Sequence, residues 1–250
     1  MRHSGASVSL LSIVGGLLIW EGISRFGVDN ALFLAAPSQI LYAIWQLALA
    51  GDLWRHIEIS GIEFILGYVI AAILGIAVGL LMAESNRAKR ILQPWISGIY
   101  ATPTIALAPL FLLWLGIGIW SKVIVVITLV IFTVIINTEA GLRTTSSRLI
   151  EMLRSFGASR SQIFWKLSLP SAAPFVLAGL KLGIGRGLIG VVVAELFGSR
   201  AGLGQLISQS ADSFNMPNLF AAVVVLATAG IVMTAGFSWL EKRLVPWTRD

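Results

Sequence analysis

The stretch FILGYVIAAILGIAVGLLMA, residues 64–83, decides the fold class of this chain. It consists of 20 consecutive uncharged residues between Glu63 and Glu84. A helix that crosses the hydrocarbon layer of a membrane needs about 20 mostly apolar residues, and this stretch supplies them without interruption. The segment therefore predicts a transmembrane helix, which we place at residues 62–83.

The composition of the whole chain supports a membrane environment. Hydrophobic residues make up 57% of the 250 residues and charged residues only 12%, whereas soluble proteins carry about 25% charge. A single globule of this size cannot bury so much apolar surface. Intrinsic disorder is excluded because disordered chains are poor in aliphatic and aromatic residues, and the absence of cysteine excludes a disulfide scaffold.

Apolar stretches predict six membrane spans in an all-α, polytopic membrane protein with a single domain over residues 1–250. The expected spans cover residues 8–26, 62–83, 96–119, 123–142, 172–197 and 219–240. The first resembles a signal peptide in its short apolar core, but no small-residue cleavage site follows it, which favours an uncleaved span. Pro103 and Pro109 lie in the third span, so we expect its backbone to be bent or broken.

Lysine and arginine are distributed unevenly between the two sides of these spans. Six spans place both termini on one side, together with twelve basic residues. These are Arg2, Arg87, Lys89, Arg90, Arg143, Arg148, Arg154, Arg160, Lys166, Lys242, Arg243 and Arg249. The opposite side has Arg25, Arg55, Lys122 and Arg200. Because basic residues favour the cytoplasmic side, both termini are predicted to be cytoplasmic. The net charge of +6 is then explained by topology, without a role in binding nucleic acid.

Residues 143–171 form the longest cytoplasmic connection, between spans four and five. Residues 148–156 place their apolar side chains largely on one side, which predicts a short amphipathic helix. Gly157 is suited to the left-handed conformation that ends a helix. Ser159 and Gln162 have the spacing of a capping box that opens a second helix, and we expect Leu169-Pro170 to end that helix before span five. The loop is therefore predicted to be two helices joined by an elbow.

Two interpretations of this loop remain open from its chemistry alone. An amphipathic helix with arginines on its polar side is typical of a segment that lies on anionic lipid. The same helix is equally suited to dock into a groove on a cytoplasmic partner.

The order of residues in the loop resembles the signature of ABC-importer permeases, which reads Glu-Ala-Ala, three residues, Gly, nine residues, Ile-x-Leu-Pro. Glu151, Gly157, Leu169 and Pro170 stand at the matching positions. Departures from the pattern are Met152 and Leu153 for the alanines and Leu167 for the isoleucine. Further stretches resemble the branch that imports nitrate, taurine and aliphatic sulfonates. These stretches are residues 36–39, 103–109, 115–118, 155–160 and 193–197.

The resemblance implies a permease subunit that moves a small anionic solute, such as a sulfonate, taurine, nitrate or a bicarbonate-like anion, into the cytoplasm. It implies a homodimer in the bacterial inner membrane, two cytoplasmic ATPase subunits that bind ATP and Mg²⁺, and a periplasmic or lipid-anchored substrate-binding protein. The chain itself has no Gly-x-x-x-x-Gly-Lys-Ser/Thr phosphate loop, so we expect it to be no enzyme and to hold no cofactor. The resemblance implies a coupling role for Glu151, Phe156, Gly157, Ala158, Ser159, Leu169 and Pro170.

Two other classes of protein agree less well with this sequence than an ABC-importer permease does. A secondary transporter driven by an ion gradient is the alternative, although its typical internal repeats are not evident here. A membrane-embedded enzyme lacks a convincing set of catalytic residues, and with no cysteine and two distant histidines a dedicated Cys/His metal site has no candidates.

Ionisable residues inside the spans are candidates for the translocation pathway, because they are costly in a membrane. They are Glu139, Lys181, Arg186 and Glu195. Lys181 is equally able to extend toward the interface, and Arg186 to pair with a neighbouring helix. Glu195 lies nine residues beyond Arg186, or about 13.5 Å along a helix, so the two should not pair, and we expect Glu195 near the periplasmic mouth. Glu139 suits either a gate or interhelical hydrogen bonds.

Glycines at four-residue spacing predict close helix packing. They are Gly75 and Gly79 in span two and Gly179, Gly183 and Gly187 in span five. Both a dimer interface and static packing within the chain agree with this pattern. Outside the membrane, residues 198–218 contain Leu203, Leu206 and Ile207, which suggests a short helix resting on the membrane surface. With residues 27–60, this segment is expected to offer a docking surface for a binding protein.

Overall fold

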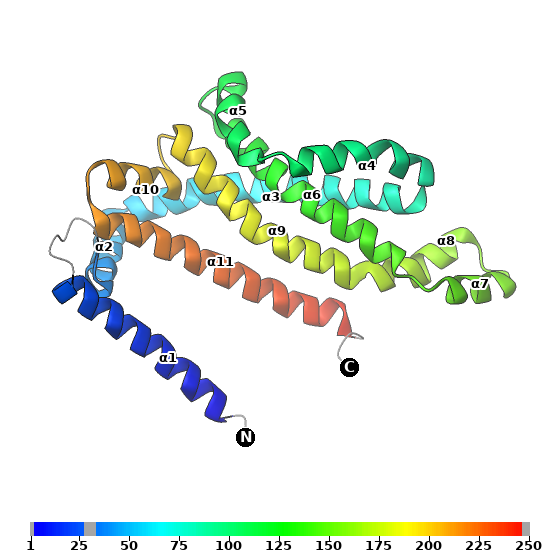
Figure 1. Cartoon of the computed structure of the whole chain (residues 1–250), viewed down its shortest axis with the longest axis horizontal. Coiled ribbons are helices and arrows are strands. Elements are labelled where there is room, and N and C mark those ends of the chain that lie inside the picture. Colours follow the sequence, from blue (N-terminus) through cyan, green and yellow to red (C-terminus); the bar gives the residue numbers. More distant parts are fainter. Residues whose placement is uncertain (1–2, 28–33, 247–250) are drawn as a thin grey trace. The chain divides into compact units, whose positions relative to one another are not determined.

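The computed structural model describes residues 3–27 and 34–246, and the elements in these ranges are all helical (Figure 1). The α-helices are α1 (His3–Gly22), α2 (Pro37–Ala50), α3 (Asp52–Glu84), α4 (Asn86–Ala101), α5 (Ala108–Leu115), α6 (Ile119–Arg143), α7 (Ser147–Ser155), α8 (Arg160–Ile163), α9 (Leu169–Gly198), α10 (Leu203–Asp212) and α11 (Met216–Leu244). A 3₁₀ turn occupies Thr104–Leu107, and π-helical turns occupy Ile23–Gly27 and Phe164–Ser168.

Six expected spans agree with the helices of the structure. Five described helices or helix runs are long and apolar enough to cross a membrane, and α4 and α5 together supply a sixth. This last pair is bent by 82°. The break falls at Thr102 and Pro103, where Thr102 ends α4 by donating its N–H to Ile99. Because Pro103 has no N–H to continue a helical ladder, the predicted interruption of the third span is confirmed.

The helices extend beyond the spans expected from hydropathy. Helix α3 begins ten residues before the predicted residue 62, and α6 begins at Ile119 rather than residue 123. Leu169-Pro170 was expected to end a helix, and this expectation is wrong: residues 160–198 form one helical run of 39 residues. Pro170 follows the π turn Phe164–Ser168, where Leu169 donates to the carbonyl of Phe164 five residues back. The wider turn relieves the clash that a proline ring makes in a regular α-helix.

The chain divides into two compact units. The first unit comprises residues 1–60 and 200–227, and the second comprises residues 61–199 and 228–250. The expectation of a single domain over residues 1–250 stays a prediction. The first unit consists mainly of the segments 27–60 and 198–218, which were assigned to the non-cytoplasmic side, with α1 and the start of α11.

Helix α10 has a buried apolar side within the first unit. Leu203 and Leu206 are 3% and 7% exposed and pack with Leu53 of α3 and Ala222 of α11. The short helix expected at this position is therefore present, but the expectation that its leucines rest on the membrane surface is wrong. They contact protein because α3 and α11 supply an apolar surface that is distant in sequence.

In the second unit, α3, α6 and α9 pack against one another, and α6 supplies the centre of the core. Val126, Val130 and Val134 of α6 are fully buried. The glycines pack against this helix: a Cβ atom added at Gly75 would lie 2.8 Å from Cβ of Val134, and one at Gly179 would lie 2.6 Å from Cβ of Asn137. Both glycine stripes therefore serve close packing inside one protomer, rather than the alternative of a dimer interface.

Candidate functional site

The predicted elbow between α7 and α8 is present in the structure. Gly157 has a φ of +80°, a left-handed conformation that glycine adopts readily and most other residues adopt only at a steric cost. Its N–H donates to the carbonyl of Arg154 at 2.9 Å, and Ala158 N–H donates to Leu153 at 3.0 Å. These two bonds form the Schellman motif that ends a helix. The sequence local to the elbow therefore sets its geometry.

The capping box at the start of α8 is also confirmed. Ser159 N–H donates to Oε1 of Gln162 at 2.8 Å, and Gln162 N–H donates to Oγ of Ser159 at 3.3 Å. Two backbone donors that a helix start leaves unpaired are thereby satisfied. The elbow and the start of α8 are consequently hydrogen-bonded regular structure rather than an irregular loop.

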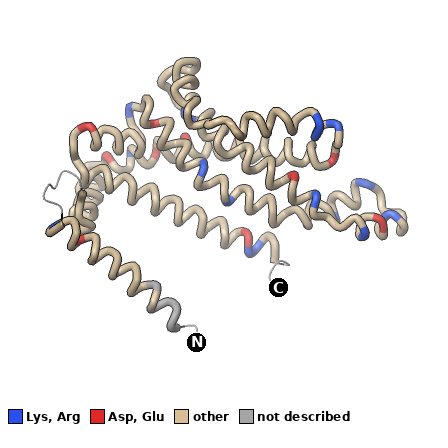
Figure 2. The backbone as a smooth tube through the Cα atoms, viewed as in Figure 1, with Lys and Arg blue, Asp and Glu red and all other residues tan. Residues whose placement is uncertain are grey.

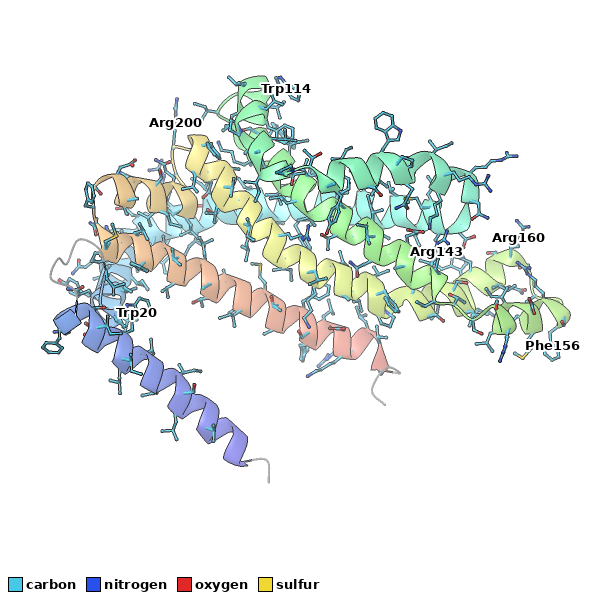
Figure 3. All side chains as sticks on the ribbon, viewed as in Figure 1. Trp20, Trp114, Arg143, Phe156, Arg160 and Arg200 are labelled. Carbon is cyan, nitrogen blue, oxygen red and sulfur yellow. The ribbon has the colours of Figure 1, made fainter. Side chains whose placement is uncertain are left out.

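Apolar side chains of α7 face outward. Phe156 stands at the tip of the elbow and is 81% exposed (Figure 3). Leu149 and Met152 are also more than 40% exposed. Phe156 is thus almost uncovered and the other two are partly covered, so α7 presents an apolar surface together with arginines on its other positions. Figure 2 shows basic residues gathered on α7, on α8 and at the turn between α3 and α4.

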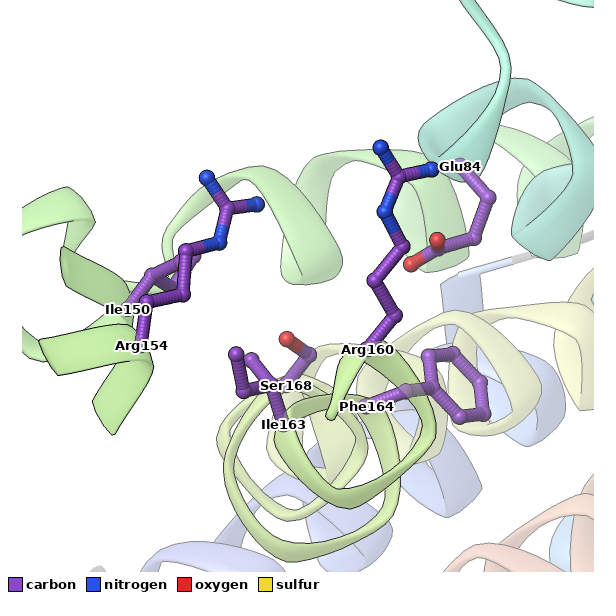
Figure 4. Close-up of a pocket in the computed structure, with 7 residues that line it drawn as sticks. All are labelled: Glu84, Ile150, Arg154, Arg160, Ile163, Phe164 and Ser168. Carbon is purple, nitrogen blue, oxygen red and sulfur yellow. The ribbon is translucent and has the colours of Figure 1, made fainter. Parts of the chain in front are cut away.

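A notch of about 280 Å³ lies between α7 and the turns that follow the elbow (Figure 4). Arg154 extends into it from α7 and Arg160 from α8, and Glu84 at the end of α3 lies at its edge. Its other lining residues are Ile150, Ile163, Phe164 and Ser168. The notch is therefore lined by both charged and apolar side chains.

The predicted coupling residues do not all lie in this protruding part. Glu151 and Phe156 lie on or at the end of α7, and residues 157–159 form the elbow. Leu169 and Pro170 lie instead in the first turn of α9 and are half-buried. They connect the loop to the membrane helix and do not form part of its exposed surface.

Glu139 forms an ionic link between helices. Its Oε1 atom accepts from Nζ of Lys89 in α4 at 2.7 Å and from Nε of Arg143 in α6 at 2.6 Å. The side chain of Glu139 is 13% exposed. Of the two roles left open for this residue, the geometry supports interhelical bonding, which ties α4 to the end of α6.

Lys181 and Arg186, both on α9, have different surroundings. Lys181 Nζ lies 3.6 Å from a carboxylate oxygen of Glu241 on α11. Arg186 is exposed, its Nη2 atom donates to the hydroxyl of Tyr100 at 3.0 Å, and its guanidinium lies 5.4 Å from the centroid of that ring. No carboxylate among the described residues is in ion-pair distance of Arg186. Its charge is thus held in place by an aromatic residue and is not neutralised.

Glu195 is completely buried, and its expected place near the periplasmic mouth stays a prediction. It contacts Glu63 of α3, and Lys122 of α6 is close enough to interact with both carboxyl groups. Glu63 and Lys122 are 4% and 3% exposed. Atom Oε2 of Glu63 has no hydrogen-bond partner among the described residues. These three residues, which we call the buried charge cluster, join α3, α6 and α9.

Sequence reasoning missed Glu63 because it served only to bound the uncharged run, and it missed Lys122 because that residue was counted only for topology. A usable signal was present, since all three members of the buried charge cluster stand at the non-cytoplasmic ends of their predicted spans. Charges at the same depth on different helices are candidates for contact, because an unpaired charge at that depth is costly.

Comparison with known proteins agrees with the helical fold and with the family that the sequence resembles. Residues 71–250 match the family model for the binding-protein-dependent transport system inner membrane component. The chain is 33% identical to the putative aliphatic sulfonates transport permease protein SsuC of Bacillus subtilis, over 92% of this chain and 84% of SsuC. It is also 33% identical to the formylaminopyrimidine transport permease protein ThiX of Halalkalibacterium halodurans, over 93% of this chain and 92% of ThiX.

A solved structure has the same fold. The chain aligns with a structure of the MetNI methionine ABC transporter in an inward-facing conformation with a TM-score of 0.62 and 19% identity, covering 78% of this chain and 95% of that one. The family match spans more than half of the chain, and the two permeases match nearly all of it. The chain therefore belongs to the family of binding-protein-dependent transport system inner membrane components, and it is a multi-pass permease subunit of an ATP-driven ABC importer.

Proposed function

We propose that this permease moves a small sulfonate-like oxyanion into the cytoplasm and is driven by two ATPase subunits that dock on α7, the elbow and α8. The docking of the ATPase subunits is supported by the exposed apolar surface of α7, with Phe156 81% exposed at its tip. An amphipathic helix with an uncovered apolar side suits a groove on a partner protein. ATP and Mg²⁺ would be bound by that partner.

The coupling loop is mechanically continuous with a membrane helix. Residues 160–198 form one helical run, so a displacement of α8 moves α9 without an intervening flexible joint. Helix α9 is in turn packed closely on α6 through Gly179 and Gly183. Movement of an ATPase would therefore shift several helices together as a rigid body, a common form of switching transition.

Arg186 supports an anionic solute. Its guanidinium is exposed on α9, has no carboxylate in ion-pair distance among the described residues, and is oriented by Tyr100. Guanidinium groups bind oxyanions through two parallel hydrogen bonds. Of the relatives compared above, SsuC is named for aliphatic sulfonates, whereas ThiX is named for formylaminopyrimidine. A charged residue in this position favours the sulfonate-like class.

The remaining parts of the proposal concern assembly and topology. We infer a homodimer, with a binding protein that delivers the solute to the non-cytoplasmic side and with both termini in the cytoplasm of a bacterial cell. The uneven distribution of basic residues supports this orientation. Because the chain has no cysteine, labelling of Ser161→Cys and Ala211→Cys in intact cells tests it. The proposed orientation requires a membrane-impermeant maleimide to label only the second variant.

Transport is tested in proteoliposomes that contain this permease with its ATPase and binding protein. We expect uptake of labelled ethanesulfonate to require ATP and to persist when an ionophore collapses ion gradients. Uptake that needs no ATP and fails with the ionophore would instead establish the ion-driven alternative. Arg186→Gln should lower uptake by about tenfold or more, because it removes charged hydrogen bonds to the anion, and Arg186→Lys should retain part of it.

The docking surface has a matched control. Phe156→Ala should weaken the association of the ATPase and uncouple ATP hydrolysis from uptake. Trp114→Ala removes a comparable aromatic side chain, 69% exposed, from α5 (Figure 3), and should leave ATPase association unchanged. Equal effects of the two substitutions would contradict the assignment of the docking surface to α7.

A further inference from the structure

Basic residues on the non-cytoplasmic side are few, and two of them stand apart. Of the four assigned to that side, Lys122 belongs to the buried charge cluster. Arg25 is paired, because its Nε atom lies 2.6 Å from Oε1 of Glu21. Arg55 and Arg200 have no carboxylate in ion-pair distance among the described residues. Since insertion selects against positive charge on this side, two exposed, unneutralised arginines there call for an explanation.

Both arginines line the same hollow in the first unit. Its volume is about 460 Å³, within the range of about 300–1,000 Å³ that is usual for small-molecule sites. The lining also includes Asp52, His56, Gln209 and Asn215, and its only apolar members are Leu47, Ala201 and Leu206. The lining therefore has two arginines and several further side-chain hydrogen-bond donors, but only one carboxylate.

The backbone around the hollow holds the two arginines together. Gly202 N–H donates to Nδ1 of His56 at 2.9 Å, and Leu203 N–H donates to Oγ of Ser60 at 2.8 Å. These bonds fasten the segment that carries Arg200, two residues before Gly202, onto the first turns of α3, which carry Arg55. The backbone hydrogen bonds of the fold thus hold the two sides of the hollow together.

From this convergence we propose that the hollow is a binding site for an oxyanion group, a sulfonate or a carboxylate, on the non-cytoplasmic side of the permease. Arg55 and Arg200 bind the oxygen atoms with charged hydrogen bonds, and the neighbouring amide side chains complete the site. Asp52, which also lines the hollow, lowers the net positive charge of its lining. The side assigned to the site rests on the topology given under the proposed function.

The oxyanion has two possible sources, and the experiment has an arm for each. It is either a free small anion in transit or the carboxylate of a side chain on the extracytoplasmic binding protein. In the first arm, the full-length permease in nanodiscs of neutral lipid is titrated with sodium methanesulfonate and followed by calorimetry, with sodium chloride at equal ionic strength as the reference. In the second arm, association of the binding protein is measured by surface plasmon resonance at increasing salt.

We expect one arm to respond to both Arg55→Gln and Arg200→Gln with a loss of affinity of about tenfold each, as for a removed charged hydrogen bond. Arg25→Gln, which removes an arginine of the same unit that is already paired, is the matched control and should change neither arm. Loss in the first arm identifies a free anion, and loss in the second identifies a partner carboxylate. Unchanged affinities in both arms, or anion binding that depends on Arg186 but on neither Arg55 nor Arg200, would overturn the proposal.

Failure of this site is distinguishable from failure of the proposed function. Suppose that uptake requires ATP and falls with Arg186→Gln, but the Arg55 and Arg200 substitutions do not change binding. This result refutes only the proposed oxyanion site. Conversely, uptake that does not require ATP refutes the proposed energy source. It leaves the oxyanion site untouched, because calorimetric binding of methanesulfonate at Arg55 and Arg200 does not depend on ATP.

Discussion

Replacement of Lys122 by methionine is the sharpest test of the buried charge cluster. Met is an unbranched side chain one atom shorter than Lys, and it removes the ammonium group with its charge and its hydrogen-bond donors. In the second unit, Lys122 is 3% exposed and stands beside two carboxyl groups, Glu63 and Glu195, which are 4% and 0% exposed. The substitution leaves those carboxyl groups together without a cation and without access to water.

The size of the effect follows from this burial. Removing one partner of a buried ion pair costs about 3–5 kcal/mol, because the remaining charge is neither solvated nor paired. A loss of that size is a large part of the roughly 5–15 kcal/mol by which proteins are stable. For a chain of this length it lowers Tm by on the order of 10 °C. We therefore expect Lys122→Met to unfold at clearly lower temperature in detergent or nanodiscs, with a reduced amount of protein in the membrane.

Two further variants separate charge from packing. Lys181→Met removes a lysine whose ion pair with Glu241 spans 3.6 Å and is about one-third exposed, so its cost should stay below about 1 kcal/mol. The triple variant Lys122→Met, Glu63→Gln, Glu195→Gln removes all three charges and should regain most of the lost stability, because neutral groups replace buried ion networks at little cost. The reasoning is refuted if Lys122→Met and Lys181→Met shift Tm equally, or if the triple variant is less stable than Lys122→Met alone.

Substitutions at three further sites test the packing, the elbow and the ion pairs of Glu139. Gly67→Ala places a Cβ atom 2.6 Å from Cβ of Val126 and should cost about 1–3 kcal/mol by overpacking, whereas Gly61→Ala, with nothing within 4 Å, should be close to neutral in the same thermal unfolding assay. Gly157→Val should uncouple uptake from ATP hydrolysis because a β-branched residue resists a φ of +80°. Gly157→Asn should retain coupling because asparagine tolerates that conformation. If both variants lose coupling, glycine is required at this position for close approach by the partner instead. Glu139→Gln weakens the ion pairs with Lys89 and Arg143 and should lower stability by about 1 kcal/mol, given their partial exposure, an effect that high salt should reduce in the wild type.

Much of the fold was predictable because its signals are local. The uncharged run 64–83 is long and apolar enough by itself to indicate a membrane span. The interruption at Pro103 follows from a missing backbone donor. The elbow was predicted correctly because Gly157, Ser159 and Gln162 act on backbone groups within a few residues of themselves. Each of these features is decided by neighbours along the chain.

Other features depended on residues that are distant in sequence. Glu63, Lys122 and Glu195 meet only because α3, α6 and α9 pack against one another. The leucines of α10 are buried because α3 and α11 provide an apolar surface, and Pro170 continues a helix because the preceding π turn makes room for its ring. In the same way, the backbone contacts of His56 and Ser60 bring Arg200 to Arg55.

The sequence by itself thus determined the environment, the number of spans and the shape of the coupling loop. Hydrophobic length, backbone donors and the φ preference of glycine are properties of single segments, and they hold in any tertiary arrangement. The tertiary structure alone decided which charges are paired, which are buried and which remain available to bind an anion. Pairing depends on distances of a few ångströms between side chains on different helices, and these distances are set by how the helices pack.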